Sequence, residues 1–244
     1  MSVASAGGLV SLAALINRGR TMSSRCVLGL FAKWPQAGAV KTRLGGGPDW
    51  GARVARAFLL DTVARLKTVD AFRVLAFAPE TAADSFWDLL DGSFHLTPQG
   101  DGDLGARMAR FIARDLLAGG GAVVLVGADS PTLPIAYIED AFDRLESVDL
   151  VLGPATDGGY YLIGCRGGVP PIFDGIAWGG AEVLAQTIAQ LNDPQRRLSL
   201  LPPWYDVDTP ESWTMLRGHV AALRRAGVDP GVPLTEALLH ESAS

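Results

Sequence analysis

Residues 26–44 read CVLGLFAKWPQAGAVKTRL and carry the strongest structural signal in the chain. The apolar run 26–31 is typical of a β-strand, and the proline and glycine that follow predict a loop. Three cations lie in this loop: Lys33, Lys41 and Arg43. Gly38 allows a ligand close to the backbone, and lysine and arginine form charge-assisted hydrogen bonds with phosphate oxygens. The loop therefore predicts a phosphate site, with a solvated basic turn as the alternative.

The composition sets limits on the class of protein. The chain has 244 residues, of which 48% are hydrophobic, and its formal net charge is −5. This acidic balance argues against a nucleic-acid partner, and the apolar stretches are too short to predict a membrane span. Cys26 and Cys165 both lie in apolar runs and lack zinc-site spacing, which predicts free thiols in a cytoplasmic protein.

The expected domain organisation has three parts. Residues 1–24 are rich in small side chains and are expected to form a disordered extension, in which Met22 offers an alternative start. Residues 25–227 show no internal repeat or linker and are expected to form a single domain. Residues 228–244 are expected to form a tail with one short helical turn.

Strand-like and helix-like segments alternate along the chain, which predicts an α/β fold with a mostly parallel sheet covered by helices. The run 122–127, AVVLVG, is apolar throughout, as in a strand buried on both faces. The first long helix is expected from Trp50 to Lys67, with Asp49 as its cap. Ligands of such sheets bind beyond the carboxyl ends of the strands, so the functional residues are expected there.

The segment Gln99–Arg107 is rich in glycine and leads into an expected helix over residues 104–117. Gly102, Asp103 and Gly105 are predicted to contact a nucleotide, because glycines let backbone amides meet a flat or charged ligand. Arg107 falls in the first helical turn, where the helix dipole disfavours a cation. That position favours a ligand contact, with a surface salt bridge as the alternative.

Two acidic signals follow other expected strands. Asp129 comes directly after the buried run, and Asp206 and Asp208 precede an expected helix that Thr209 caps and Pro210 begins. Alternation along an extended segment places both of the latter carboxylates on the same side, free of the cap. Carboxylate oxygens suit a hard divalent cation. These residues predict a metal–phosphate site, with turn capping by Asp129 as the alternative.

The segment Thr156–Tyr161 contains Asp-Gly-Gly, which is typical of a hairpin turn. The alternative interpretation is that the two tyrosines that follow the glycines face a substrate pocket. No dinucleotide-binding glycine motif or Walker loop occurs. None of the three histidines lies near a nucleophile in the sequence, which disfavours covalent acyl chemistry.

Five segments in order and spacing resemble a known family: residues 31–44, 99–108, 127–131, 153–162 and 206–211. The family is an uncharacterised glycosyltransferase-A-like one, related to 2-phospho-L-lactate guanylyltransferase and to the molybdenum-cofactor nucleotidyltransferases. The resemblance covers Cys26 to about Arg225. It implies the nucleotide-diphospho-sugar transferase (GT-A) fold, a Rossmann-like three-layer α/β/α sandwich.

The resemblance also implies roles for particular residues. Asp129 and Asp208 would hold Mg²⁺ or Mn²⁺, the loop after the first strand would hold nucleotide phosphates, and the segment Gly102–Gly105 would lie near the base. The implied substrate-binding residues are Asp157, Gly158, Gly159, Tyr160 and Trp178. Gly179 and Gly180 follow that tryptophan where many relatives carry hydroxyl residues, and Ser212 stands where many carry aspartate.

The expected function is nucleotidyl transfer from a nucleoside triphosphate to a small phosphorylated or hydroxyl acceptor. Lys41, Arg43 and Asp129 are the expected catalytic residues. Glycosyl transfer from a nucleotide-diphospho-sugar is the first alternative. A nucleotide-binding protein without turnover is the second.

Overall fold

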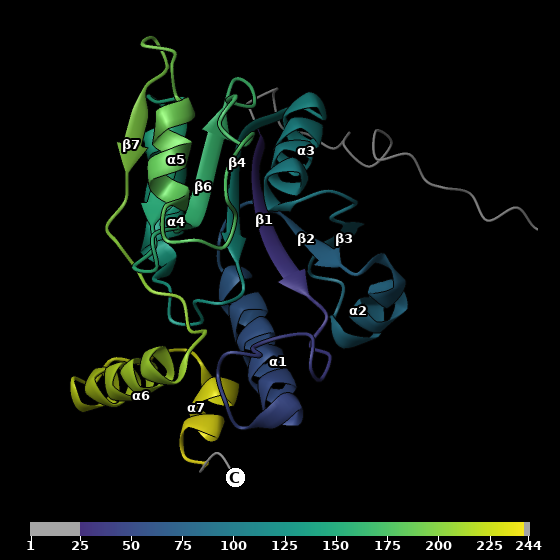
Figure 1. Cartoon of the computed structure of the whole chain (residues 1–244), viewed down its shortest axis with the longest axis vertical. Helices are drawn as coiled ribbons and strands as arrows, with labels where there is room; N and C mark the ends of the chain where they lie inside the picture. Colours follow the sequence, from purple (N-terminus) through teal and green to yellow (C-terminus); the bar gives the residue numbers. More distant parts are fainter. Residues whose placement is uncertain (1–24, 242–244) are drawn as a thin grey trace, which may run out of the picture.

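The computed structural model describes residues 25–241, so the expected extension over residues 1–24 lies outside the described residues (Figure 1). The strands are β1 (Arg25–Lys33), β2 (Phe72–Ala78), β3 (His95–Pro98), β4 (Gly120–Gly127), β5 (Leu150–Pro154), β6 (Tyr160–Arg166) and β7 (Leu198–Leu200). The helices are α1 (Gly47–Leu66), η2 (Glu80–Ala82), α2 (Ala83–Leu89), α3 (Leu104–Leu117), α4 (Ile135–Leu145), α5 (Val183–Gln190), α6 (Pro210–Arg225) and α7 (Pro233–Leu239).

The strands form one sheet in the order β3-β2-β1-β4-β6-β5-β7. All neighbours are parallel except that β6 runs antiparallel to β4 and β5, so the mostly parallel sheet is confirmed. Strand β1 lies between β2 and β4, where the order of strands reverses along the sheet. Such a switch point leaves a crevice beyond the carboxyl ends of the two strands, and ligands of this fold class bind there.

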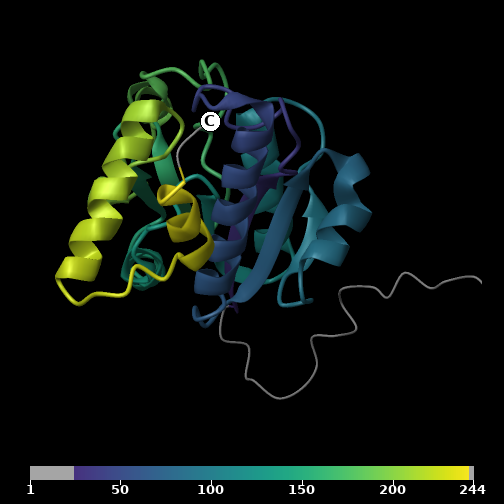
Figure 2. The same cartoon turned by 90° about the horizontal axis from the view of Figure 1, so that it is seen from below.

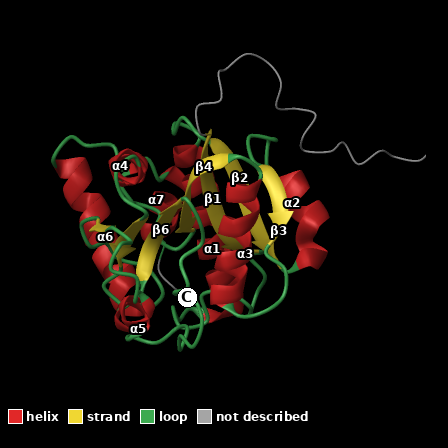
Figure 3. Ribbon diagram, turned by 90° about the horizontal axis from the view of Figure 1, so that it is seen from above, coloured by secondary structure: helices red, strands yellow, loops and turns green. Residues whose placement is uncertain are grey.

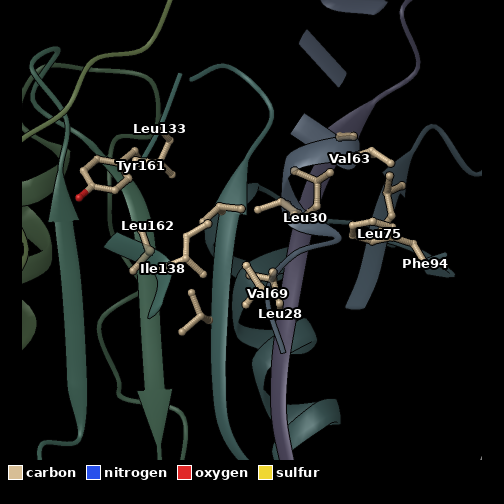
Figure 4. Packing of buried hydrophobic residues seen from close by; sticks show 14 of the residues in the cluster. Leu28, Leu30, Val63, Val69, Leu75, Phe94, Leu133, Ile138, Tyr161 and Leu162 are labelled. Atoms are coloured by element: carbon tan, nitrogen blue, oxygen red, sulfur yellow. The ribbon is translucent and has the colours of Figure 1, made fainter. Parts of the chain in front are cut away.

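Side chains of β1 alternate between the two faces of the sheet. Leu28 and Leu30 pack against α1, α2 and α4. Figure 4 shows Leu30 near Val63 of α1 and Leu75 of β2, and Leu28 beside Val69. Val27 faces the opposite side, where α3 and α5 cover the sheet. Figure 3 shows helices on both sides of the strands, which is the three-layer α/β/α arrangement.

Helix α1 begins at Gly47, three residues before the expected start. Gly46 adopts a left-handed conformation (φ 72°) as its N-cap, and Pro48 lies in the first turn, where its fixed φ suits a helix. Asp49 therefore lies inside the first turn and does not cap the helix. The start signal is the glycine run 45–47, which turns the chain into the helix.

The segment 228–241 packs into the domain, beyond the expected boundary at residue 227. Val232, Leu238 and Leu239 are buried in a third cluster with Phe58 of α1 and Leu216 of α6, and Figure 2 shows α7 between these two helices. Within the segment expected to be a tail, Pro233 begins α7. Among the described residues, every helix is too short or too polar to cross a lipid bilayer.

Candidate active site

A cavity of about 650 Å³ lies at the carboxyl ends of β1 and β4. The loop after β1 and the start of α3 form one side, and the β5–β6 turn and the loop before α5 form the other. The predicted site residues that line it are Lys33, Lys41, Arg43, Gly102, Asp103, Arg107, Asp129, Asp157, Gly159, Tyr160, Trp178 and Asp208. Three predicted glycines, Gly38, Gly105 and Gly158, are not among the lining residues.

Lys41 bonds directly to the two predicted metal ligands. Its Nζ atom donates to Oδ1 of Asp208 at 2.9 Å and lies 2.5 Å from Oδ1 of Asp129. It also donates to the carbonyl oxygen of Val207 at 2.7 Å, and its side chain is only 3% exposed. Arg43, which is 69% exposed, donates to Oδ2 of Asp208 at 3.2 Å. Two of the three predicted phosphate-binding cations, Lys41 and Arg43, are therefore paired with the predicted metal-binding carboxylates.

Opposing effects set the pKa of Lys41. Burial alone would lower the pKa, but the carboxylates of Asp129 and Asp208 outweigh it and raise the pKa above its ordinary value. The side chain is consequently a charged ammonium ion at neutral pH. The backbone of Lys41 adopts φ 50°, a left-handed conformation that costs free energy for a lysine. Strain of this kind concentrates at functional sites.

Two sets of hydrogen bonds position Asp208 near Asp129. The amide of Val207 donates to the carbonyl oxygen of Asp129 at 3.0 Å and joins the segment before α6 to the loop after β4. The hydroxyl of Ser212 accepts from the amides of Asp208 and Thr209, which completes a capping box at the start of α6. Ser212 thus supports the cap of α6.

Asp206 also lines the cavity but has a different partner. Its carboxylate accepts a hydrogen bond from the hydroxyl of Ser130. Burial, together with the negative charges of Asp129, Asp157 and Asp208, raises its pKa to about 6, although the Ser130 hydrogen bond opposes this. As expected, neither Asp206 nor Asp208 caps α6, because Thr209 and Ser212 do so. Each carboxylate instead has a partner that was not predicted, Ser130 for Asp206 and the cations Lys41 and Arg43 for Asp208. From the sequence alone, Ser130 indicates no more than a turn.

Hydrogen bonds of Asp103 and Arg107 hold the glycine-rich segment before α3 in place. Asp103 is the N-cap of α3, and its Oδ1 accepts from the amide of Ala106 at 2.8 Å. Arg107 donates to the carbonyl oxygen of Gly102 at 2.9 Å and to Oε1 of Gln99 at 3.4 Å. Within the described residues it forms no ion pair, in contrast to the salt-bridge alternative, and it is one of the residues that line the cavity.

Gln99 is a site residue whose role the sequence did not reveal. Its buried amide donates to the carbonyl oxygens of Ala32 and Ala76, at the ends of β1 and β2. These bonds hold the glycine-rich segment against the sheet. A glutamine directly after a strand gave no signal by itself, because the bonds depend on the neighbouring strands.

The opposite wall combines a hairpin turn with an aromatic corner. Oδ1 of Asp157 accepts from the amide of Gly159 in the turn between β5 and β6, so the hairpin interpretation is confirmed. Tyr160 and Trp178 meet edge to face, with ring centroids 6.4 Å apart. A Cβ atom on Gly158 would lie 1.9 Å from the carbonyl oxygen of Ala181, so only glycine fits there.

Gly105 has a comparable packing role on the other side. A Cβ atom at this position would lie 2.6 Å from Cζ2 of Trp178. The absence of a side chain therefore allows the indole to rest on the start of α3. Gly105 and Gly158 shape the cavity by permitting close packing of the residues that line it.

The residues present suit a divalent cation in chemistry and charge. Magnesium in transferase sites commonly takes one or two carboxylates together with substrate phosphates, and Asp129 and Asp208 offer two. Asp129 is 54% exposed and Asp208 is 31% exposed, so both are accessible from the cavity. Among residues 25–241, no group of three or more His, Cys, Asp or Glu side chains is arranged to hold a metal ion without a substrate.

Solved structures with the same fold include several transferases. A protein from Desulfovibrio desulfuricans G20, provisionally described as a nucleotide-diphospho-sugar transferase, is 32% identical with a TM-score of 0.80 over 88% of this chain and 96% of its own. The 4-diphosphocytidyl-2C-methyl-D-erythritol synthase of Anaerococcus prevotii DSM 20548 is 11% identical with a TM-score of 0.54, covering 81% and 99%. A cytidylyltransferase of Leptospira borgpetersenii is also 11% identical, with a TM-score of 0.51 over 88% and 94%.

At 11% identity the two cytidyl-transferring enzymes establish the fold alone. No curated protein matches the chain. A family model described as "Uncharacterized protein conserved in bacteria (DUF2064)" matches residues 59–180, half of the chain. With this match and the D. desulfuricans structure, the chain belongs to the DUF2064 family and has the nucleotide-diphospho-sugar transferase fold.

Proposed function

We propose that the protein is a divalent-metal-dependent transferase that moves a nucleotidyl group from a nucleoside triphosphate to a small phosphorylated or hydroxyl acceptor. One observation carries the proposal: the cations after β1 meet the carboxylates after β4 and before α6 in a single cavity. Lys41 and Arg43 contact Asp208, and Lys41 also contacts Asp129. A triphosphate and its metal ion need both kinds of group at the same place.

The walls of the cavity suggest where each part of the substrates binds. Lys33, Lys41 and Arg43 lie on the phosphate side, and the braced segment from Gly102 to Arg107 offers backbone and guanidinium donors to the base. The acceptor would then bind at the opposite wall, which is formed by Asp157, Tyr160 and Trp178. The α-phosphorus would then lie between the two walls, in reach of both substrates.

In the proposed reaction, an oxygen atom of the acceptor forms a bond to the α-phosphorus. The bond from that phosphorus to the oxygen bridging to the β-phosphorus breaks, and pyrophosphate leaves with the electron pair. Lys41 and Arg43 stabilise negative charge on the phosphate oxygens. A bound Mg²⁺ or Mn²⁺, held by Asp129 and Asp208, would supply further charge neutralisation. A phosphate acceptor is already ionised and needs no general base.

Glycosyl transfer is the second candidate. The provisional description of the 32% identical D. desulfuricans protein favours it. The same cations and metal would then stabilise a nucleoside diphosphate as leaving group. A nucleotide-binding role without turnover is less well supported, because simple binding does not require paired carboxylates beside the phosphate cations.

Product analysis separates these possibilities. The protein would be incubated with Mg²⁺, each nucleoside triphosphate and pools of small phosphorylated compounds or alcohols, and pyrophosphate release would be measured. A parallel series would contain nucleotide-diphospho-sugars, with release of nucleoside diphosphate as the readout. Nucleotidyl transfer predicts acceptor-dependent pyrophosphate release that Asp129→Asn abolishes. Nucleoside diphosphate release alone would instead establish glycosyl transfer, and nucleotide binding without either product would establish the binding role.

A further inference from the structure

Lys41 occupies the position between the two carboxylates that a divalent cation would need. Its Nζ atom is within 2.9 Å of one oxygen of Asp129 and one of Asp208. A doubly charged cation bound to the same two oxygens would lie beside the ammonium group. Repulsion between like charges at such a distance is strong where one of them is shielded from water, and the Lys41 side chain is only 3% exposed. The ammonium and a metal ion therefore compete for these carboxylates.

The position of Lys41 is built into the fold. Its side chain is almost completely buried, and its ammonium lies 5.2 Å from the ring centroid of Phe58 in α1. The main chain is fixed as well, because the amide of Leu44 donates to the carbonyl oxygen of Lys41. A Cβ atom on Gly51 would lie 2.8 Å from the carbonyl oxygen of Val40, so α1 packs closely against the loop that carries Lys41.

A buried ammonium leaves its carboxylates only for another anion, because its charge is costly without a partner. Phosphate oxygens provide such an anion. Arg43, which is exposed and has one contact at 3.2 Å, is available to meet the phosphates first. Once Lys41 turns to the phosphates, the carboxylate oxygens that it held become available to a metal ion.

We propose that Lys41 is an internal counter-ion that keeps a divalent cation out of the Asp129–Asp208 pair until nucleotide phosphates draw the ammonium away. This inference rests on the proposed function and adds an order of binding to it. Metal and nucleotide then bind with positive coupling, and the free protein has low affinity for the metal alone.

The test measures Mn²⁺ binding to the protein without nucleotide, by electron paramagnetic resonance of the unbound ion. The wild type is expected to bind Mn²⁺ weakly at the pair. Lys41→Met is expected to bind it roughly tenfold or more tightly, because a positive charge about 3 Å from the carboxylate oxygens has been removed. The double variant Lys41→Met/Asp129→Asn should lose this gain, which would locate the bound ion.

Two further variants keep the test decisive. Lys67→Met removes the same charge from an exposed side chain outside the cavity and should leave Mn²⁺ affinity close to that of the wild type. Lys41→Gln removes the charge but keeps a donor for Val207, and it replaces Lys41→Met if that variant does not fold.

Equal Mn²⁺ affinity of the wild type and the folded Lys41 variant would overturn the counter-ion role and leave the proposed function intact. Absence of Mn²⁺ binding in both proteins, with and without nucleoside triphosphates, would overturn the proposed function and this inference together.

Discussion

Nζ of Lys41 lies 2.5 Å from Oδ1 of Asp129, and this ion pair joins the loop after β1 to the loop after β4 across the switch point of the sheet. The pair links the two halves of the candidate site in the free protein. It means that Lys41 has a structural role before any substrate arrives.

Loss of the Lys41 charge should lower the free energy of unfolding. Lys41→Met leaves Asp129 and Asp208 without their shared partner, and we expect a cost of about 1–3 kcal/mol, below the range for fully buried pairs because Asp129 is half exposed. Arg43→Met is the matched control, with an expected cost below about 1 kcal/mol since Arg43 is exposed. Urea unfolding measures both, and equal costs would contradict the structural role.

Arg107 should contribute to nucleotide affinity, whereas Arg110 should not. Both arginines brace the segment before α3, because Arg110 donates to the carbonyl oxygens of Gln99 and Asp101, but only Arg107 lines the cavity. Loss of a charge-assisted contact costs about 1.5–3 kcal/mol. Calorimetry should therefore show a roughly ten- to hundredfold weaker nucleotide affinity for Arg107→Met and little change for Arg110→Met. Similar losses in both variants would mean that Arg107 acts only through the loop.

Two glycine-to-alanine changes in helices should have opposite effects. Gly105→Ala places a methyl group 2.6 Å from Cζ2 of Trp178 and 2.7 Å from the carbonyl oxygen of Phe173. Overpacking of this kind costs about 1–3 kcal/mol. A Cβ atom on Gly218 in α6 would point into open space, so Gly218→Ala should stabilise by up to about 1 kcal/mol. Thermal unfolding measures both, and a stabilising Gly105→Ala would contradict the described packing of Trp178.

The half-buried His219 should make stability depend on pH. Its Nδ1 atom lies 2.7 Å from the hydroxyl of Tyr205, and burial lowers its pKa. The unfolded chain takes up this proton near pH 6.5, but the folded chain does so only at lower pH. As the pH falls below about 6.5 the unfolded state binds more protons, so the free energy of unfolding decreases.

In His219→Gln this contribution should be absent. Urea unfolding at pH 8 and at pH 5 should show a smaller pH dependence for this variant than for the wild type. The exposed His240 provides the control variant His240→Gln. An unchanged pH dependence in His219→Gln would contradict the role of burial at this residue.

Much of the fold was predictable because its signals are local. The apolar run 122–127 identified β4, and the alternation of strands and helices indicated the parallel sheet. The start of α1 and the packing of α7 were not predictable in the same way. The first depends on Gly46 in a left-handed conformation, and the second depends on Asp61, whose carboxylate accepts from the amides of Leu234 and Thr235.

For the site, the residue types and their positions at the ends of expected strands were enough to predict that Lys41, Asp129 and Asp208 lie together, and all three line one cavity. The partners of these side chains could not be predicted. Lys41 and Asp208 are 167 positions apart, and their contact depends on the backbone bond between Val207 and Asp129. The buried bonds of Gln99 likewise require the ends of β1 and β2 to be in place.

The most direct test of the central claim is calorimetric titration of the protein with each nucleoside triphosphate, with and without Mn²⁺. We predict that at least one nucleotide binds the wild type with Mn²⁺ present, that removal of Mn²⁺ weakens this binding, and that Asp129→Asn and Asp208→Asn remove the effect of the metal. Nucleotide binding that is equally tight without Mn²⁺, or a metal effect that survives in both variants, would contradict the assignment of a metal–nucleotide site to Asp129 and Asp208.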